Sequence, residues 1–128
     1  MRSVIAAAAF AALVFQSAAA QETSKAVEID MSNYAFAPSA LTFQSGQSYT
    51  LHLVNKSGKD HSFSSKAFFA AVDVAPADQS KIDGGEVEVD DGQSVDIAFT
   101  ARTPGSYPFE CSHFLHASFG MTGTAVIR

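Results

Sequence analysis

Residues 107–121 read Tyr-Pro-Phe-Glu-Cys-Ser-His-Phe-Leu-His-Ala-Ser-Phe-Gly-Met and change from a strand pattern to a loop. Tyr107, Phe109 and Cys111 occupy every second position, with Pro108 and Glu110 between them. Such alternation is typical of a strand with one buried face. It predicts a strand that ends at Cys111, with the sulfur on the core side, followed by a loop.

The loop holds three side chains that suit a soft, redox-active metal. Cys111, His116 and Met121 are separated by four residues and then by four more, and Cys111 is the only cysteine of the chain. Two His and one Cys in a plane with a weak axial Met form a typical copper site. A second histidine must come from elsewhere, and His61, at the head of another predicted strand, is the best placed. We therefore predict that His61, Cys111, His116 and Met121 bind one copper ion.

Each of these residues also has a simpler interpretation. Cys111 could be a small buried residue, Met121 could fill the core, and His61 could be a loop histidine without a role. The complete set in the order His, Cys, His, Met favours the metal. His113 is too close to Cys111 to share the ion easily, so we expect it at the edge of the site. His52 has no neighbour at ligand spacing and is predicted to be a partly exposed strand histidine.

Alternation of apolar and polar residues continues outward from this stretch. It predicts short strands at residues 27–31, 40–43, 49–54, 86–89, 95–99 and 122–127, and one that starts at His61. Turn signals such as Asp90-Asp91-Gly92 and Thr103-Pro104-Gly105 separate them. Seven or eight short strands of this kind predict an all-β fold, an antiparallel Greek-key β-sandwich of about 100 residues.

The pattern changes once, near residues 66–73. Phe68, Phe69 and Val72 repeat at helical spacing, and Pro76 indicates a stop. We predict a short helical insertion here, whose two phenylalanines pack rather than bind a ligand.

The first twenty residues resemble a secretory signal. Arg2 precedes an apolar run at residues 4–15, and Ala18-Ala19-Ala20 supplies a small-residue cleavage site. An uncleaved anchor is the alternative, but the run is shorter than the roughly 20 residues that span a bilayer. We therefore expect residues 1–20 to be removed, leaving one domain at 21–128 in the periplasm without stable membrane insertion.

Charge narrows the possible partners. The chain has thirteen Asp and Glu and eight Lys and Arg, of which Arg2 lies in the predicted signal. An acidic domain argues against nucleic acid and anionic membranes as partners. Export places the single cysteine in an oxidising compartment, where it must pair with another molecule, stay free or bind a metal.

Together, the Cys111-x4-His116-x4-Met121 spacing, the upstream His61 and the strand pattern resemble the type 1 blue-copper proteins, the cupredoxins of the plastocyanin/azurin group. The ligand spacing is most similar to that of the auracyanins and of the type 1 domains of multicopper oxidases. One departure is Ser62, which stands where many cupredoxins carry an asparagine that helps to pin the loops by hydrogen bonds.

The resemblance implies a carrier of single electrons by outer-sphere transfer, with one type 1 copper and no small-molecule substrate. Its implied partner is a redox protein, for instance a c-type cytochrome or a copper enzyme. An oxidase would need further copper sites, and only His52 and His113 remain for them, so we expect no enzyme. The rival function is periplasmic copper binding or delivery. Such proteins usually have open Met-rich sites, whereas residues 21–128 contain only Met31 and Met121.

Overall fold

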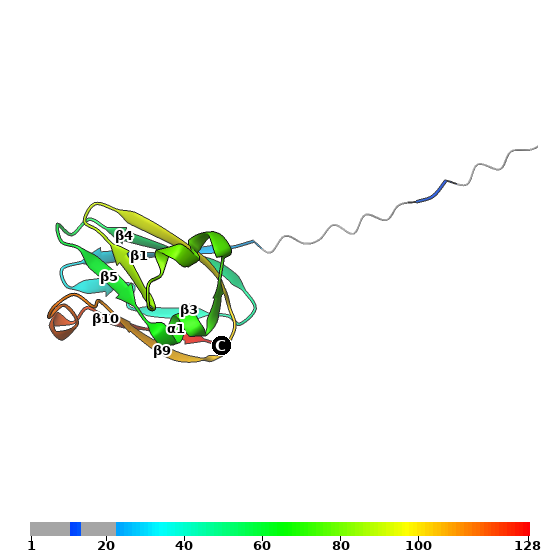
Figure 1. Ribbon diagram of the computed structural model, residues 1–128. Coiled ribbons are helices and arrows are strands. Elements are labelled where there is room, and N and C mark those ends of the chain that lie inside the picture. Colours follow the sequence, from blue (N-terminus) through cyan, green and yellow to red (C-terminus); the bar gives the residue numbers. More distant parts are fainter. Residues whose placement is uncertain (1–10, 14–22) are drawn as a thin grey trace, which may run out of the picture.

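The computed structural model describes residues 11–13 and 23–128 and consists of two five-stranded sheets packed face to face (Figure 1). The predicted signal at 1–20 lies outside the described residues, apart from 11–13. The described part of the chain contains ten strands: β1 (Lys25–Ser32), β2 (Ala35–Ala37), β3 (Ala40–Phe43), β4 (Ser48–Asn55), β5 (His61–Ser64), β6 (Val72–Val74), β7 (Glu86–Val89), β8 (Ser94–Ala101), β9 (Gly105–Glu110) and β10 (Thr122–Ile127).

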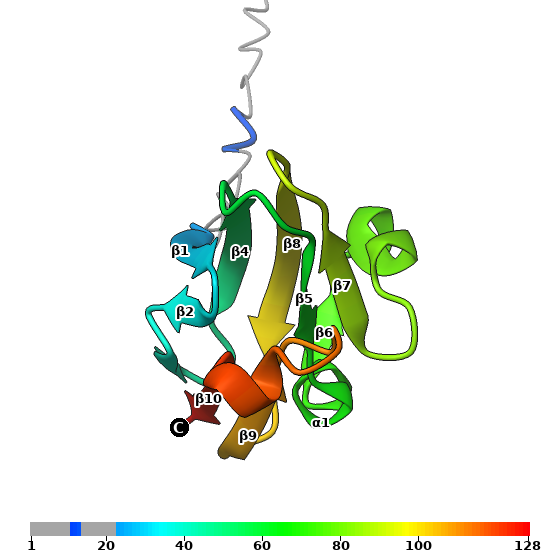
Figure 2. The ribbon, with the colours of Figure 1, turned by 90° about the vertical axis from the view of Figure 1, so that its left-hand side faces the viewer.

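One sheet has the strand order β2-β1-β4-β8-β6 and the other has the order β3-β10-β9-β5-β7. From β3 to β8 each successive strand lies in the opposite sheet, so the connections cross repeatedly between the two layers (Figure 2). The all-β sandwich predicted from the sequence is confirmed. The strand count is higher than seven or eight because the three-residue strands β2 and β6 carry too little alternation to be recognised.

The sheets are mixed rather than purely antiparallel, which corrects the predicted arrangement. β1 pairs with β4 in parallel, and β10 pairs with β3 in parallel. In both pairs the chain crosses to the other sheet before it returns, so it runs in the same direction when it arrives beside its partner. Alternation along one strand reports its buried face and not the direction of its neighbour.

The core lies between the sheets and is rich in aromatic rings. Phe63 stacks on Phe109 with ring centroids 4.6 Å apart, and Phe36 meets Phe109 edge to face at 5.1 Å. Phe68 is fully buried and joins this cluster from the helical insertion. The Phe pair of the insertion therefore packs, as predicted, and the strands that deliver His61 and Cys111 are anchored in a rigid interior.

The helical insertion is shorter than predicted. Helix α1 (Lys66–Ala70) is capped at its N-terminus by Ser65, whose hydroxyl oxygen accepts the Phe68 N–H at 3.2 Å, and the helix ends at Ala70. Val72 belongs to strand β6, and Pro76 opens the 3-10 helix η1 (Pro76–Lys81) rather than ending a structure. Pro is favoured at the first helical position because its missing N–H has no partner there.

Three connections meet at one end of the sandwich: the turn between β1 and β2, residues 56–60 between β4 and β5, and residues 111–121 between β9 and β10 (Figure 1). The last of these contains the short 3-10 helix η2 (Ala117–Phe119). Among the described residues, no helix has the length and apolar character that a membrane crossing requires.

Candidate metal centre

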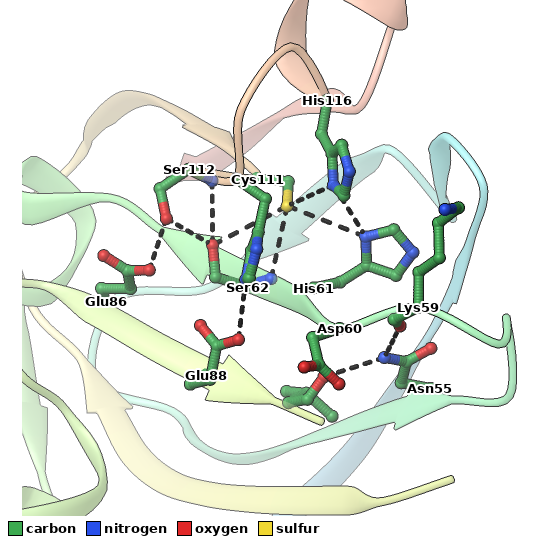
Figure 3. A network of polar contacts seen from close by, with 12 residues as sticks. Asn55, Lys59, Asp60, His61, Ser62, Glu86, Glu88, Cys111, Ser112 and His116 are labelled. Atoms are coloured by element: carbon green, nitrogen blue, oxygen red, sulfur yellow. Dashed lines mark hydrogen bonds and ion pairs between the residues drawn. The ribbon is translucent and has the colours of Figure 1, made fainter. Parts of the chain in front are cut away.

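Three predicted ligands converge at this end of the sandwich. The Nδ1 atoms of His61 and His116 lie 3.2 Å apart. The Sγ of Cys111 lies 3.8 Å from Nδ1 of His61 and 3.4 Å from Nδ1 of His116 (Figure 3). Within the described residues this is the one group of three or more His, Cys, Asp or Glu side chains whose ligand atoms all lie within 4.8 Å of one another.

The spacing of the three atoms fits a single ion. An ion with bonds of about 2.0 Å to nitrogen and about 2.3 Å to sulfur holds such donors roughly 3.3–3.7 Å apart at trigonal to tetrahedral angles. Of the observed separations of 3.2, 3.4 and 3.8 Å, one lies within that range and the other two lie just outside it. Two imidazoles and a thiolate are also the donors that copper prefers.

His61 opens strand β5 and is completely buried. Its Nε2 lies 2.8 Å from Oδ1 of Asn33, in the turn between β1 and β2. An amide oxygen accepts only, so Nε2 carries the proton and the lone pair of Nδ1, which faces His116 and Cys111, would be available to a metal ion. The Asn33 amide nitrogen also donates to the Ser57 carbonyl at 3.0 Å, which fixes Asn33 itself.

The loop before His61 is held by the fully buried Asn55 at the end of β4. Its Nδ2 donates to the carbonyls of Lys59 and Val89, each at 2.8 Å. Its Oδ1 accepts from the hydroxyl of Ser57 at 2.7 Å. These bonds set the path of residues 56–60 and therefore the position of His61.

Cys111 lies just beyond β9 with its sulfur in the core, as its place in the alternation predicts. Its N–H donates to the Met121 carbonyl at 3.1 Å, which closes the base of the ligand loop. The backbone N–H of Ser62 points at the sulfur at 3.4 Å. The Ser62 hydroxyl accepts the N–H of Ser112 at 2.9 Å, so Ser62 ties β5 to the ligand loop.

His116 sits on the exposed side of the site. The Met121 N–H donates to its carbonyl at 3.1 Å, and its ring packs on Tyr34 with centroids 4.8 Å apart. Three apolar side chains around it face solvent: Phe114 is 87% exposed, Leu115 47% and Phe119 60%. An apolar surface thus surrounds His116, the more accessible of the two predicted imidazole ligands.

Met121 is fully buried. Its two backbone hydrogen bonds, to Cys111 and to His116, place it on the same short loop as these two ligands. This position is consistent with the weak axial ligand that the sequence predicts, and that role stays a prediction.

Burial lowers the pKa of both imidazoles. For His61 the main cause is desolvation, followed by the charge that His116 would carry; for His116 it is desolvation followed by His113. Both rings are therefore neutral near pH 7, with a lone pair available for a metal.

The two other histidines lie where the sequence places them. His113 stacks on His116 at 5.5 Å between centroids, and its Nε2 lies 2.7 Å from Oε1 of Glu88, at the edge of the site. His52 is partly exposed on β4 and pairs with Asp96 of β8.

Sequence reasoning missed Asn33 and Tyr34. Both lie far from the ligand loop along the chain, and an asparagine between two strands indicates only a turn. Asn33 and Tyr34 lie in the turn between β1 and β2, so the alternation that predicts the strands gives no signal for their contacts with the histidines.

The sequence matches the cupredoxin-like domain family over residues 4–127. The chain therefore belongs to the cupredoxin-like family. A comparison with curated protein sequences finds no significant match.

Solved structures with the same fold include two auracyanins. Auracyanin B is 20% identical, with a TM-score of 0.59, covering 84% of this chain and 92% of its own. Dithionite-reduced auracyanin from Roseiflexus castenholzii is 23% identical, with a TM-score of 0.60 and coverages of 82% and 98%. A multicopper oxidase from Campylobacter jejuni is 14% identical, with a TM-score of 0.63, covering 84% of this chain but only 30% of the oxidase.

Family and donor set agree. A cupredoxin-like chain with two imidazole nitrogens and a cysteine sulfur gathered around one point is a blue-copper protein with a site for one type 1 copper ion.

Proposed function

We propose that this protein carries single electrons by outer-sphere transfer, with the copper held by His61, Cys111 and His116 and by Met121 as a weak axial ligand. The observation that carries the proposal is the preassembled set of ligand atoms, buried except at His116. Because the ligands are already in place and rigidly held, the site needs little rearrangement when copper changes between Cu(II) and Cu(I). When bound, copper supplies the redox change.

The surroundings of the site support transfer without a substrate. His61, Cys111 and Met121 are inaccessible to solvent, so a small molecule has no route to the ion on their side. The exposed apolar ring of Phe114, Leu115 and Phe119 around His116 suits brief contact with another protein over a small area. We infer that the protein is not an enzyme and that its partner is a redox protein such as a c-type cytochrome or a copper enzyme.

The same burial argues against copper delivery. A delivery protein must pass its ion to another protein through ligand exchange, which requires accessible ligands. Here the sulfur of Cys111 is enclosed by β5 and the ligand loop. We therefore favour electron transfer over the delivery function.

Periplasmic location is part of the proposal and is supported by the sequence of residues 1–20. Its test is the N-terminal sequence of the protein isolated from the periplasmic fraction, which we expect to begin at Gln21. A mature chain that retains Met1 would contradict this.

Electron transfer is tested by stopped-flow oxidation of the reduced copper protein with a cationic c-type cytochrome. We expect rapid, reversible transfer that slows as ionic strength rises, because an acidic protein attracts a basic partner. Phe114→Ser should slow transfer and leave the copper spectrum unchanged. A matched substitution on the far sheet, Thr50→Ser, should alter neither. Tight copper binding without measurable electron transfer would favour delivery.

A further inference from the structure

A chain of hydroxyl groups joins the sulfur of Cys111 to a carboxylate on the edge strand β7. The Ser62 hydroxyl oxygen lies 3.8 Å from Cys111 Sγ and 2.8 Å from Ser112 Oγ. Ser112 Oγ in turn contacts Oε1 of Glu86 (Figure 3). Ser62 is completely buried, so the inner end of this chain is shielded from water.

The carboxylate decides which way the hydrogens point. A carboxylate accepts only, so the Ser112 hydroxyl donates its single hydrogen to Glu86. The Ser112 oxygen is then left as an acceptor. The Ser62 hydroxyl, which also has one hydrogen, donates it to Ser112 at 2.8 Å rather than to the sulfur at 3.8 Å.

The sulfur therefore keeps the backbone N–H of Ser62, at 3.4 Å, and receives no hydroxyl hydrogen. The Ser62 oxygen accepts from the Ser112 N–H at 2.9 Å, which holds it in position. A further contact, with the Ser64 hydroxyl at 3.4 Å, is longer than these and does not change their order.

Hydrogen bonds to the sulfur and nearby charge both affect the copper potential. A donor on the thiolate withdraws electron density from sulfur and so favours Cu(I). When one electron reduces Cu(II), the charge of the site falls by one unit, which a nearby carboxylate disfavours. Glu86 therefore lowers the reduction potential by two effects. It keeps a hydroxyl hydrogen off the sulfur, and its negative charge disfavours the reduced state.

We propose that Glu86 sets the reduction potential of the copper by turning the hydroxyls of Ser112 and Ser62 away from the Cys111 sulfur. Glu86 is a positioning residue that never contacts the ion. The inference rests on the proposed copper electron-transfer site and adds the device that tunes it.

The test is the reduction potential of Glu86→Gln, measured by potentiometric titration of the copper protein. A Gln amide can donate to Ser112 Oγ, which frees the Ser112 hydroxyl to donate to Ser62 and the Ser62 hydroxyl to turn to the sulfur. We expect the Cu(I)/Cu(II) ratio at a fixed applied potential to rise about tenfold, which is about 59 mV for one electron.

Glu110→Gln is the matched control for charge alone. Glu86 and Glu110 flank the same residue, Ser64, in the sheet register, and Glu110 adjoins Cys111 in sequence. Within the described residues the Glu110 side chain has no hydrogen bond to the hydroxyl chain. Its substitution should shift the ratio by no more than about twofold.

A second variant, Ser62→Ala, tests the contribution of the Ser62 hydroxyl. In a Ser62→Ala background the hydrogen that turns to the sulfur is gone, so Glu86→Gln should there shift the ratio no more than Glu110→Gln does. The resonance Raman copper–sulfur bands of Glu86→Gln should also become sensitive to exchange into D2O beyond the wild type, which reports a new exchangeable hydrogen on sulfur.

Equal shifts for Glu86→Gln and Glu110→Gln would overturn the proposal, and so would a Glu86→Gln shift that survives Ser62→Ala. In either case the protein would still bind copper through sulfur, and the proposed function would stand. A wild-type protein that shows no copper–thiolate absorption would instead overturn the proposed function itself, and this inference with it.

Discussion

Asn33 and His61 are joined by a hydrogen bond of 2.8 Å between Oδ1 and Nε2, although 28 positions separate them along the chain. The bond connects the turn after β1 to the head of β5. It satisfies a fully buried imidazole N–H and fixes the ring so that Nδ1 faces Cys111 and His116. The orientation of the site thus depends on a residue that is not itself a ligand.

Replacing Asn33 with Ala should lower copper affinity about tenfold, because the loss of such an outer hydrogen bond typically costs 10–100-fold. The measurement is competition with a chelator of known affinity. Ser32→Ala, which removes a hydroxyl whose hydrogen bond within the described part of the chain goes to the Ala35 carbonyl on the same turn, should leave affinity unchanged. Unchanged affinity in Asn33→Ala would show that the hydrogen bond has no part in holding His61.

Asn55→Ala should reduce the free energy of unfolding by about 2–4 kcal/mol, because it leaves the buried carbonyl of Val89 and the groups of the 56–60 loop without partners. Denaturant unfolding of the copper-free protein measures the change. Lys56→Ala, next to it but exposed, should alter stability by less than about 0.5 kcal/mol. Equal effects of the two substitutions would contradict this account of the loop.

Gly123→Ala should destabilise the protein by about 2–3 kcal/mol. A Cβ there would lie 2.2 Å from Cζ of Phe109 and 2.5 Å from the Ser39 carbonyl oxygen, so the β9–β10 pair that carries Cys111 and Met121 would have to separate. Thermal unfolding with Thr122→Ala, exposed on the same strand, as control would test this. Wild-type stability in Gly123→Ala would mean that Phe109 can move aside.

Stability of the copper-free protein should fall as pH drops below 6.5. The pKa values of His61 and His116 are lowered in the folded chain from their ordinary value of 6.5, mainly by burial. Between the folded and the ordinary values the unfolded chain therefore binds more protons, and acid favours unfolding. The dependence should be clearly weaker in a variant that carries both His61→Gln and His116→Gln. A wild type with constant stability between pH 7 and 5 would contradict the pKa directions.

Much of the fold follows from local alternation. Ile29 and Met31 in β1, Val87 and Val89 in β7, and Ile97 and Phe99 in β8 are buried where their period-two pattern places them. Whether two strands pair in parallel or antiparallel does not follow from this alternation. The parallel pairing of β1 with β4 depends on contacts between segments about twenty-four residues apart, as in Lys25 opposite Tyr49, and no local signal encodes them.

The metal centre also follows from the sequence only in part. Residue type and spacing predict Cys111 and His116 as ligands because both lie on one loop, and the structure brings these two together with His61. Asn33 could not be chosen among the polar residues of turns, since its contact with His61 exists only once β1 and β5 are packed. Ser62 ties β5 to the ligand loop through its N–H and its hydroxyl, which its short side chain alone would not suggest.

The most direct test of the central claim is the visible absorption spectrum of the mature protein with one equivalent of Cu(II), recorded beside Cys111→Ser. We predict an intense band in the middle of the visible range that is absent from Cys111→Ser and that a mild reductant bleaches reversibly, because the band arises from the bond between copper and the Cys111 sulfur. A colourless protein, or an equal band in Cys111→Ser, would contradict a type 1 copper site at His61, Cys111 and His116.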